Sequence, residues 1–233
     1  MINRSALLLL ALLAPAARAQ DASASTLAIP LGLHIGVPQG EFAQNVHIAG
    51  GFGGGLLVRM AGPLAFRADL GFMIYGSETR RVPLGGGALG LIDVDVTTTN
   101  SIVSGGIGAQ LGMPSRSLSP YLGGEIGFSA FVTSSSVRGS NSSNEPFASS
   151  TNHNDGTFAK TVMAGLYIPV GQGTTVIDLG VRHTWNGERV RYLTPGDITE
   201  DVNGDVILSP RETRADLFTI VLGVAITPGG KRR

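Results

Sequence analysis

Charged side chains are rare in this chain, and six of them stand at isolated positions within apolar stretches. Charged residues make up 15% of the 233 residues, against about 25% in an ordinary soluble domain. The six are three basic and three acidic residues: Arg59, Arg67, Asp69, Glu125, Asp178 and Arg182. Because charges removed from water must be paired, equal numbers of both signs favour an interior network of ion pairs. A path for protons or ions is the alternative use of these groups.

A second group of polar residues lies near the C-terminus. Three of them are spaced as in part of a calcium-binding loop: Asp201, Asn203 and Asp205. With Gly204 as the sixth loop position, Thr199 and Pro210 stand where such a loop needs a carboxylate and a bidentate glutamate. A hydrated acidic loop is therefore the favoured interpretation, and nothing else in the sequence indicates a metal or a cofactor.

The charge balance and the lack of Cys exclude several classes of function. The chain has 17 basic and 17 acidic residues and no Cys. Balanced charge argues against a nucleic-acid partner, which needs a basic surface. The lack of Cys excludes disulfides, thiol catalysis and cysteine metal sites.

The first 19 residues have the features of a secretory signal peptide. A basic start with Arg4 precedes an apolar run at residues 6–13, and Ala17 and Ala19 fit the small residues before a cleavage site. The run is shorter than the about 20 residues of a spanning helix. We expect residues 1–19 to be removed and residues 20–233 to form one domain. Without Arg4 and Arg18 it has 15 basic and 17 acidic groups, a net charge of −2.

Apolar residues alternate with small or polar residues in eight segments. From Leu27 to Val37, for example, every odd position is apolar, whereas the even positions include Pro30, His34 and glycines. Successive side chains of a strand point to opposite faces, so each segment is predicted to be a strand with one apolar face. The segments are residues 27–37, 51–60, 64–75, 103–113, 121–132, 158–168, 176–185 and 217–226. A tilted strand crosses a bilayer with about 9–11 residues.

The connections between the predicted strands alternate in length. Those after the second, fourth and sixth strands are short and rich in Pro, Gly and Ser, as turns are. The others are long, and they include a Ser/Asn tract at 133–157 and an acidic segment at 186–214. Short turns at one rim and long loops at the other are typical of outer-membrane barrels. The sequence therefore predicts an all-β fold, an eight-stranded antiparallel up-and-down transmembrane β-barrel.

The residue types on the second face of the strands indicate whether the apolar face points out of the barrel or into it. A soluble lipocalin-like barrel, the alternative, turns its apolar residues inward and its charged residues to water. Here the second face is mostly Gly with the six isolated charges, and Lys160 is the only Lys in a predicted strand. A face of this kind suits the inside of an eight-stranded barrel, which is just wide enough for side chains to fill. We expect apolar residues to face lipid and the interior to be closed.

On this pattern the chain resembles the small outer-membrane β-barrel family of the OmpA and OmpX type. The resemblance covers about residues 27–226 and rests on the glycine-rich stretches at 51–55 and 120–127, on Tyr75, and on the closing strand at 222–226. It implies an outer-membrane location, contact with outer-membrane lipid, and assembly by the barrel-assembly machinery. The family usually ends in an aromatic residue that this machinery recognises, whereas this chain ends in Arg233.

Residues 183–186 also resemble the His-x-Ser-Asn stretch of lipid A 3-O-deacylases, which are eight-stranded barrels as well. Those enzymes use the Ser as nucleophile and the His as base. Here Trp185 takes the place of the Ser, and Thr184 points to the opposite face from His183. A Trp that faces lipid near the outer rim is the favoured interpretation.

The sequence thus predicts a non-enzymatic, monomeric membrane barrel without a cofactor. Its function is expected in the surface loops, because loops on a rigid scaffold commonly carry binding residues. The alternatives are a barrel enzyme that modifies lipid A, a narrow channel for small solutes, and a soluble periplasmic binding barrel.

Overall fold

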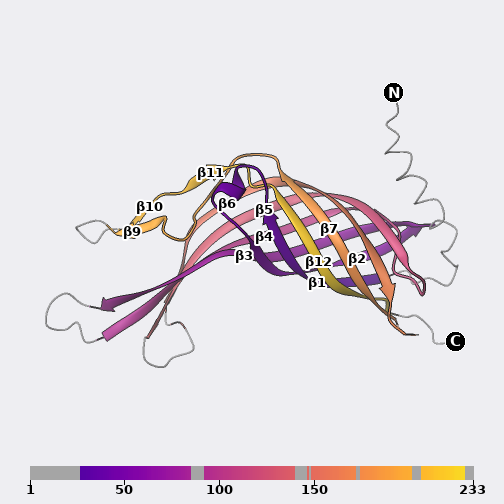
Figure 1. Ribbon diagram of the computed structural model, residues 1–233, viewed down its shortest axis with the longest axis horizontal. Coiled ribbons are helices and arrows are strands. Elements are labelled where there is room, and N and C mark those ends of the chain that lie inside the picture. Colours follow the sequence, from indigo (N-terminus) through magenta and orange to yellow (C-terminus); the bar gives the residue numbers. More distant parts are fainter. Residues whose placement is uncertain are drawn as a thin grey trace.

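The computed structural model describes residues 27–84, 92–139, 146, 148–171, 174–200 and 206–228. Within them, eight long strands form a closed antiparallel barrel in chain order, and the last strand pairs with the first (Figure 1). They are β1 (Leu27–Pro38), β2 (Ala49–Ala61), β3 (Leu64–Leu84), β4 (Ile92–Leu111), β5 (Ser119–Gly139), β6 (Ala148–Pro169), β7 (Thr175–Asn186) and β12 (Leu217–Ile226). The predicted fold class is confirmed. The predicted signal peptide, residues 1–19, lies outside the described residues.

The alternating faces of the strands are turned as the sequence predicted. In β12, Thr219 and Val221 are buried, whereas Ile220 and Leu222 have exposed fractions of 44% and 55%. The apolar face of each strand therefore forms the outer surface of the barrel, and the second face, with small, polar and some large apolar side chains, fills its inside.

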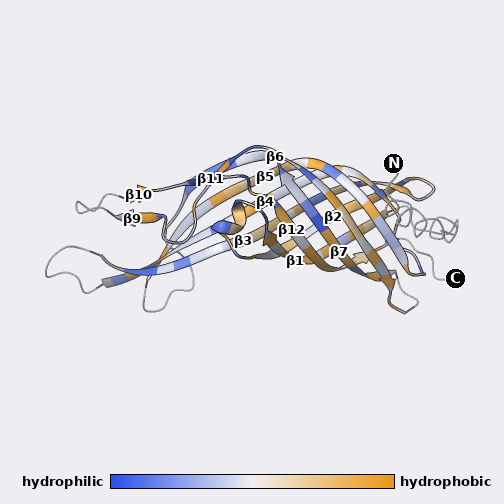
Figure 2. Cartoon of the chain, turned by 45° about the horizontal axis from the view of Figure 1, so that its top comes forward, coloured by the Kyte–Doolittle hydropathy of each residue, from blue (hydrophilic) through white to orange (hydrophobic). Residues whose placement is uncertain are grey.

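Four strands are longer than predicted. β3 and β4 pair as far as Leu84 and Ile92, and β5 and β6 pair as far as Val137 and Ala148. The prediction of one long loop at 133–157 was therefore wrong, because most of that tract is strand. Hydropathy gave a weak signal, since these strand ends are rich in Ser, Thr and charged residues, and clear alternation is confined to the short stretch from Ile92 to Val96. Figure 2 shows blue along these ends. Backbone pairing continues the sheet there, and side-chain bonds such as that between Thr79 and Thr97 support it.

The acidic segment at 186–214 is also more ordered than a loop. β8 (Val190–Tyr192) pairs with β11 (Arg211–Thr213), and β9 (Ile198–Glu200) pairs with β10 (Val206–Leu208). We call residues 187–200 and 206–216 the cap, since they lie at the end of the barrel from which β3–β6 project (Figure 1).

A single turn of 3-10 helix, η2 (Phe42–Gln44), lies between β1 and β2 at this same end. The opposite rim has tight turns, in which Gly62 and Gly171 adopt left-handed φ values of 51° and 62°. In the part of the chain that the structure describes, no helix is long and apolar enough to span a bilayer.

Candidate functional site

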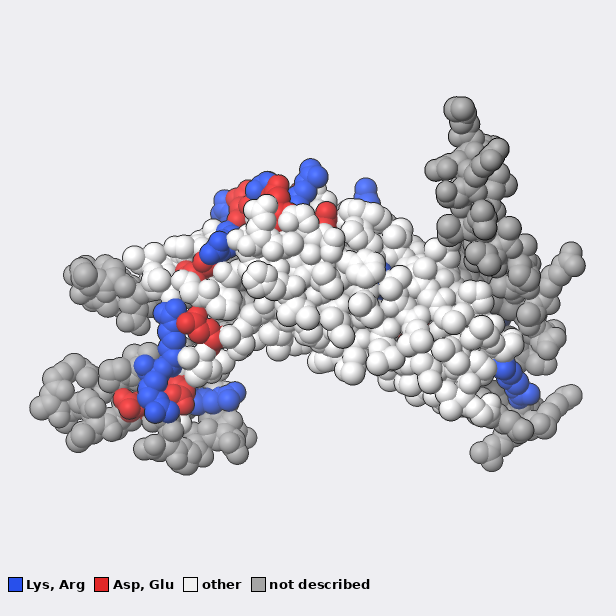
Figure 3. Space-filling model, in the orientation of Figure 1, with Lys and Arg blue, Asp and Glu red and all other residues white. Residues whose placement is uncertain are grey.

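The barrel wall is apolar on its outside. Phe52, Leu70 and Ile126 have exposed fractions of 62%, 69% and 55%. Figure 3 shows a wall with few charged residues on the face in view, whereas charged residues gather at the end where the cap lies. A band of exposed apolar side chains around a closed sheet is the surface of a barrel that faces lipid.

Four of the six sequence-predicted charges meet in one layer of the interior. Arg67 is completely buried, and its Nε lies 2.8 Å from Oδ2 of Asp69 and 3.2 Å from Oε1 of Glu125. Nη1 of Arg182 lies 2.8 Å from the same oxygen of Asp69. Nη1 of Arg67 also donates to Oε1 of Gln110, which the sequence analysis did not single out. β3, β5 and β7 thus bring two guanidinium groups and two carboxylates together.

Glycines on the facing strand leave room for this layer. Gly55 of β2 pairs with Asp69 of β3. A Cβ built on Gly55 would lie 1.9 Å from Oδ1 of Asp69 and 2.5 Å from the carbonyl oxygen of Ala68. The high glycine content of the inner face therefore has a steric cause, because large side chains must fit into a narrow barrel.

Asp178 is satisfied by a tyrosine rather than by an ion pair. The hydroxyl of Tyr121 donates to its Oδ1 at 2.8 Å, and the ring of Tyr121 stacks on Tyr167 with centroids 4.6 Å apart. A Cβ on Gly165 or on Gly180 would lie 2.5 or 2.2 Å from the hydroxyl oxygen of Tyr121. Tyr121 can cross the barrel to Asp178 only because both positions lack a side chain.

Arg59 lies apart from the charged layer. Its Nη1 donates to the carbonyl oxygen of Gly62 at 2.6 Å, in the short turn between β2 and β3. The pairing register shifts between Arg59 and Ala61, so the strand ends here and the long side chain reaches the turn. The structure therefore does not bring Arg59 to Asp69 or Glu125.

Aromatic side chains close the end of the barrel beneath the cap. Phe42 of η2 and Tyr192 of β8 are completely buried, and their ring centroids lie 5.1 Å apart. Phe42 also contacts Tyr75 and Phe131 edge-on at 5.8 Å, and the Tyr75 hydroxyl donates to the carbonyl of Leu193. The sequence did not predict this cluster, since Phe42 and Tyr192 lie in connections where alternation gives no signal.

A second buried cluster lies toward the opposite rim, around the stacked pair of Tyr121 and Tyr167. It also contains Leu57, Met113 and Met163. The charged layer therefore lies between two groups of packed apolar side chains.

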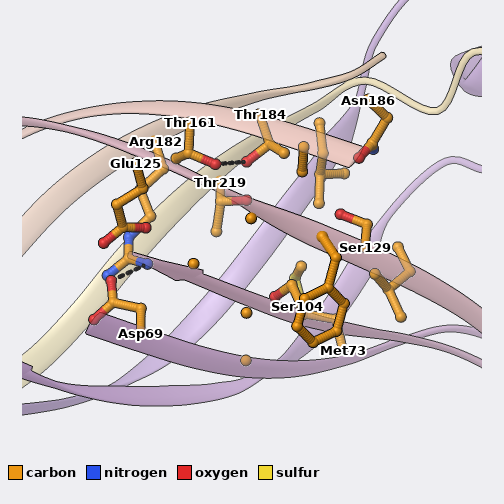
Figure 4. A pocket seen from close by; sticks show the side chains of 18 of the residues that line it. Asp69, Met73, Ser104, Glu125, Ser129, Thr161, Arg182, Thr184, Asn186 and Thr219 are labelled. Carbon is orange, nitrogen blue, oxygen red and sulfur yellow. Dashed lines mark hydrogen bonds and ion pairs between the residues drawn. The ribbon is translucent and has the colours of Figure 1, made fainter. Parts of the chain in front are cut away.

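A small cavity with mixed polar and apolar lining lies between the charged layer and the aromatic cluster (Figure 4). Its volume is about 60 Å³, and it is lined on one side by Asp69, Glu125 and Arg182. Farther along, the hydroxyl groups of Thr161 and Thr184 bond to each other at 2.9 Å. One water molecule needs about 10–15 Å³ of such volume, so the cavity suits a few waters.

The stretch that resembles the deacylase motif is split between the two faces of β7. The rings of His183 and Trp185 meet on the outer face, with centroids 4.3 Å apart, whereas Thr184 bonds to Thr161 inside the barrel. Trp185 pairs in register with Lys160 of β6, which is also exposed. The described neighbours of His183 on this face are Trp185 and the register partners of His183, Val162 and Phe218, and none of them carries a hydroxyl group.

The calcium candidates Asp201, Asn203 and Asp205 lie outside the described residues. The neighbouring Asp197 is described, and its carboxylate is engaged by Arg211 through Nε and Nη2, each at 2.9 Å. The amide N–H of Thr194 also donates to it at 2.8 Å. Burial acts to raise the pKa of Asp197, but the bonds from Arg211 and Thr194 outweigh it and hold the pKa below its ordinary value.

The projecting ends of β3–β6 carry hydroxyl side chains bonded across the strands. Thr79 bonds to Thr97 at 2.9 Å, and Ser135 bonds to Thr98 at 2.8 Å and to Asn152 at 2.6 Å. We call residues 76–84, 92–100, 133–139 and 148–157 the projecting sheet. It extends the barrel beyond the apolar wall.

Solved structures with a similar fold include bacterial surface proteins. Neisserial surface protein A has 14% sequence identity, with 87% of this chain and 97% of that chain covered and a TM-score of 0.45. Ail, the attachment invasion locus protein of Yersinia pestis, has 14% identity, the same coverages and a TM-score of 0.44. A major outer membrane protein of Thermus thermophilus has 13% identity, coverages of 85% and 98%, and a TM-score of 0.36. No protein-family model and no curated protein matches the chain.

Proposed function

We propose that the chain is an integral, non-enzymatic protein of the bacterial outer membrane. Its barrel is closed, and its projecting sheet binds a partner outside the cell. The observation that carries the proposal is the division of the molecule into an apolar wall and a polar, hydroxyl-rich sheet that continues from it. The wall serves as the membrane anchor, and the sheet serves as the contact surface.

The proposed membrane location rests on the outer surface of the barrel. Side chains such as Leu33, with an exposed fraction of 63%, would be costly in water. Trp185 and Lys160 lie side by side on the outer face, and both residue types favour the boundary between lipid and water.

The closed interior rests on the ion pairs of Arg67 and on the apolar clusters at either side of them. A narrow solute channel would need a continuous polar path past Phe42 and Tyr192. Conductance of porin size in planar bilayers would contradict a closed barrel.

The role in surface binding rests on the reach and chemistry of the projecting sheet. β3 loses its β2 partner after the pair of Gly50 with Ile74, and β6 pairs with β7 only from Ala159 onward. The cap contacts these edges near the barrel, where Arg80 donates to the carbonyl of Ile198 and the amide of Arg191 donates to Asp155. Beyond these contacts the described strand ends have no strand neighbour, and such ends offer backbone groups to an extended segment of another protein. We therefore propose a protein as the partner.

A trimmed variant tests this role. Residues 80–96 would be replaced by Asn-Gly, which forms a tight hairpin turn, so that the pair of Thr79 with Thr97 closes the strands. The matched variant replaces residues 136–149 between Ser135 and Ser150. Cells that produce either variant should attach less to protein-coated glass than cells with the full chain, although both variants still migrate on gels as folded, heat-modifiable barrels.

Equal attachment of trimmed and full-length cells would refute the role of the sheet. Release of acyl chains from lipopolysaccharide by the purified protein would refute its non-enzymatic character and favour the lipid A-modifying alternative.

A further inference from the structure

The outer wall of the barrel is uneven, and its small residues are concentrated on one side. Along β1, β7 and β12 every outward position carries a side chain larger than alanine. On β2, β3 and β4, by contrast, the outward positions include Gly54, Ala68 and Gly105. Leu70 lies between the two glycines, since it pairs with Gly54 on one side and with Gly105 on the other.

These small residues form the floor of an apolar groove. The groove has a volume of about 910 Å³ and runs across the outer faces of β2–β5. Its walls are aliphatic and aromatic side chains, among them Phe52, Leu56, Ile107 and Phe128. A Cβ on Gly105 would lie 2.8 Å from the Phe128 ring, and one on Gly54 would lie 2.6 Å from Cδ2 of Leu31. The ends of the Leu31 and Phe128 side chains therefore lie over these two glycines, and larger residues there would push them into the groove.

The chemistry of the groove selects an apolar occupant. The outward side chains that line it carry no hydrogen-bonding group, so a polar ligand would lose its bonds to water without replacement. A flexible hydrocarbon chain suits an open groove of uneven depth, and lipid chains surround this wall if the proposed membrane location is correct.

The register places one end of the groove near the interface on the side of the cap, whereas its other end, at Leu31, lies four residues from the start of β1 at the short-turn rim. Ile126, in its β5 wall, pairs with Lys160, which in turn pairs with Trp185. A lipid-facing Lys is unfavourable at the bilayer midplane and costs little near the interface. Lys160 therefore belongs near the interface on the side of the cap, and Ile126 and Phe128 lie beside it.

We propose that this groove is a binding site for one acyl chain of a membrane lipid. The inference rests on the proposed membrane location, and it assigns a specific lipid contact to one side of the barrel. The rest of the wall contacts lipid without a preferred position.

Filling the groove tests the proposal. The variant Gly54→Leu/Gly105→Leu places side chains against the flexible ends of Leu31, Leu70 and Phe128. The matched control is Ala164→Leu, which enlarges an outward position of β6 outside the groove. Each purified protein, in mild detergent, is mixed with dipalmitoylphosphatidylethanolamine, and bound lipid is counted by native mass spectrometry.

We expect the unaltered protein and Ala164→Leu to retain one lipid, and the filled variant to retain it at least tenfold less often. Dihexanoylphosphatidylethanolamine, with the same headgroup and short chains, should be retained poorly by all three. Equal retention by the filled variant, or equal retention of both lipids, would overturn the proposal. So would a dimer that disappears on filling, because a second copy would then occupy the groove.

Heat-modifiable migration on gels shows that each variant is folded. Failure of the unaltered protein to insert into lipid vesicles would refute the proposed membrane location, whereas normal insertion without a retained lipid would refute only the acyl-chain site.

Discussion

Arg67 shows how this barrel tolerates charge in its interior. Its guanidinium is completely buried, and it lies within ion-pair distance of Asp69 and Glu125. Burial of a cation and an anion costs free energy, because both lose their contacts with water. Their mutual attraction offsets this cost only when each charge has its partner in good geometry. The layer is therefore sensitive to the loss of any one member.

The sequence predicted the face on which these residues lie but not their partners. Alternation places Arg67 and Asp178 inside, because side-chain direction has a period of two along a strand. The bonding partner of each charged side chain depends on the register between strands and on the length of the side chain. The alternation pattern gives no information on either. Asp178 thus bonds to Tyr121, and Arg59 reaches Gly62 instead of an acid.

Replacement of Arg67 by Met should destabilise the barrel by about 3–5 kcal/mol, because Asp69 and Glu125 would remain buried without their shared cation. Urea unfolding in lipid vesicles, followed by gel migration, measures the loss. Adding Asp69→Asn and Glu125→Gln to Arg67→Met should restore much of the stability. An Arg67→Met protein as stable as the unaltered one would show that the layer is not a paired network.

Replacement of Gly180 by Ala should cost about 1–3 kcal/mol, as overpacking commonly does, because the new Cβ would meet the Tyr121 hydroxyl at 2.2 Å. Unfolding in urea measures this cost. Tyr121→Phe in the same chain should recover part of it by removing that oxygen. The control is Gly124→Ala, whose Cβ would come no closer than 3.7 Å to its neighbour. Equal costs at Gly180 and Gly124 would contradict the packing described for Tyr121.

At the scale of elements, the number and order of the barrel strands could be predicted, and their ends could not. The predicted strand at 64–75 continues to Leu84, where alternation of hydropathy has already stopped. Strand segments that face the membrane must alternate between apolar residues and small or polar residues. The strand ends outside the membrane need only backbone hydrogen bonds to the neighbouring strands. The cap was missed for a related reason: three-residue strands such as β8 (Val190–Tyr192) are too short to show a pattern.

The cap should loosen in acid. Asp197 has a pKa below its ordinary value, and a carboxyl of this kind stabilises the folded state above the unfolded pKa of about 3.9 and loses this contribution as the pH falls through the folded pKa. The amide of Thr194, which donates to Asp197, should therefore shift in NMR spectra at a pH below the ordinary Asp range. Asp197→Asn should abolish the shift, whereas Glu41→Gln, in the exposed pair with Arg189, should leave it unchanged. A midpoint at or above the ordinary Asp value would contradict the bond to Arg211.

At the scale of the whole molecule, the central claim is that the barrel is inverted, with apolar residues outside and ion pairs inside. This arrangement sets the lipid-facing wall, the glycine-rich interior and the polar sheet beyond the wall. A soluble binding barrel with the same strand order would place Leu222 in its interior and Arg67 in water.

The direction in which Leu222 points is the most direct test. In a Trp185→Phe chain, which otherwise has no Trp, Leu222→Trp introduces one fluorophore at a position with an exposed fraction of 55%. In vesicles of phospholipid with brominated acyl chains, we predict strong quenching of this Trp compared with unbrominated vesicles. Fluorescence that brominated chains leave unchanged, from a protein that stays dissolved without lipid or detergent, would contradict the inverted barrel.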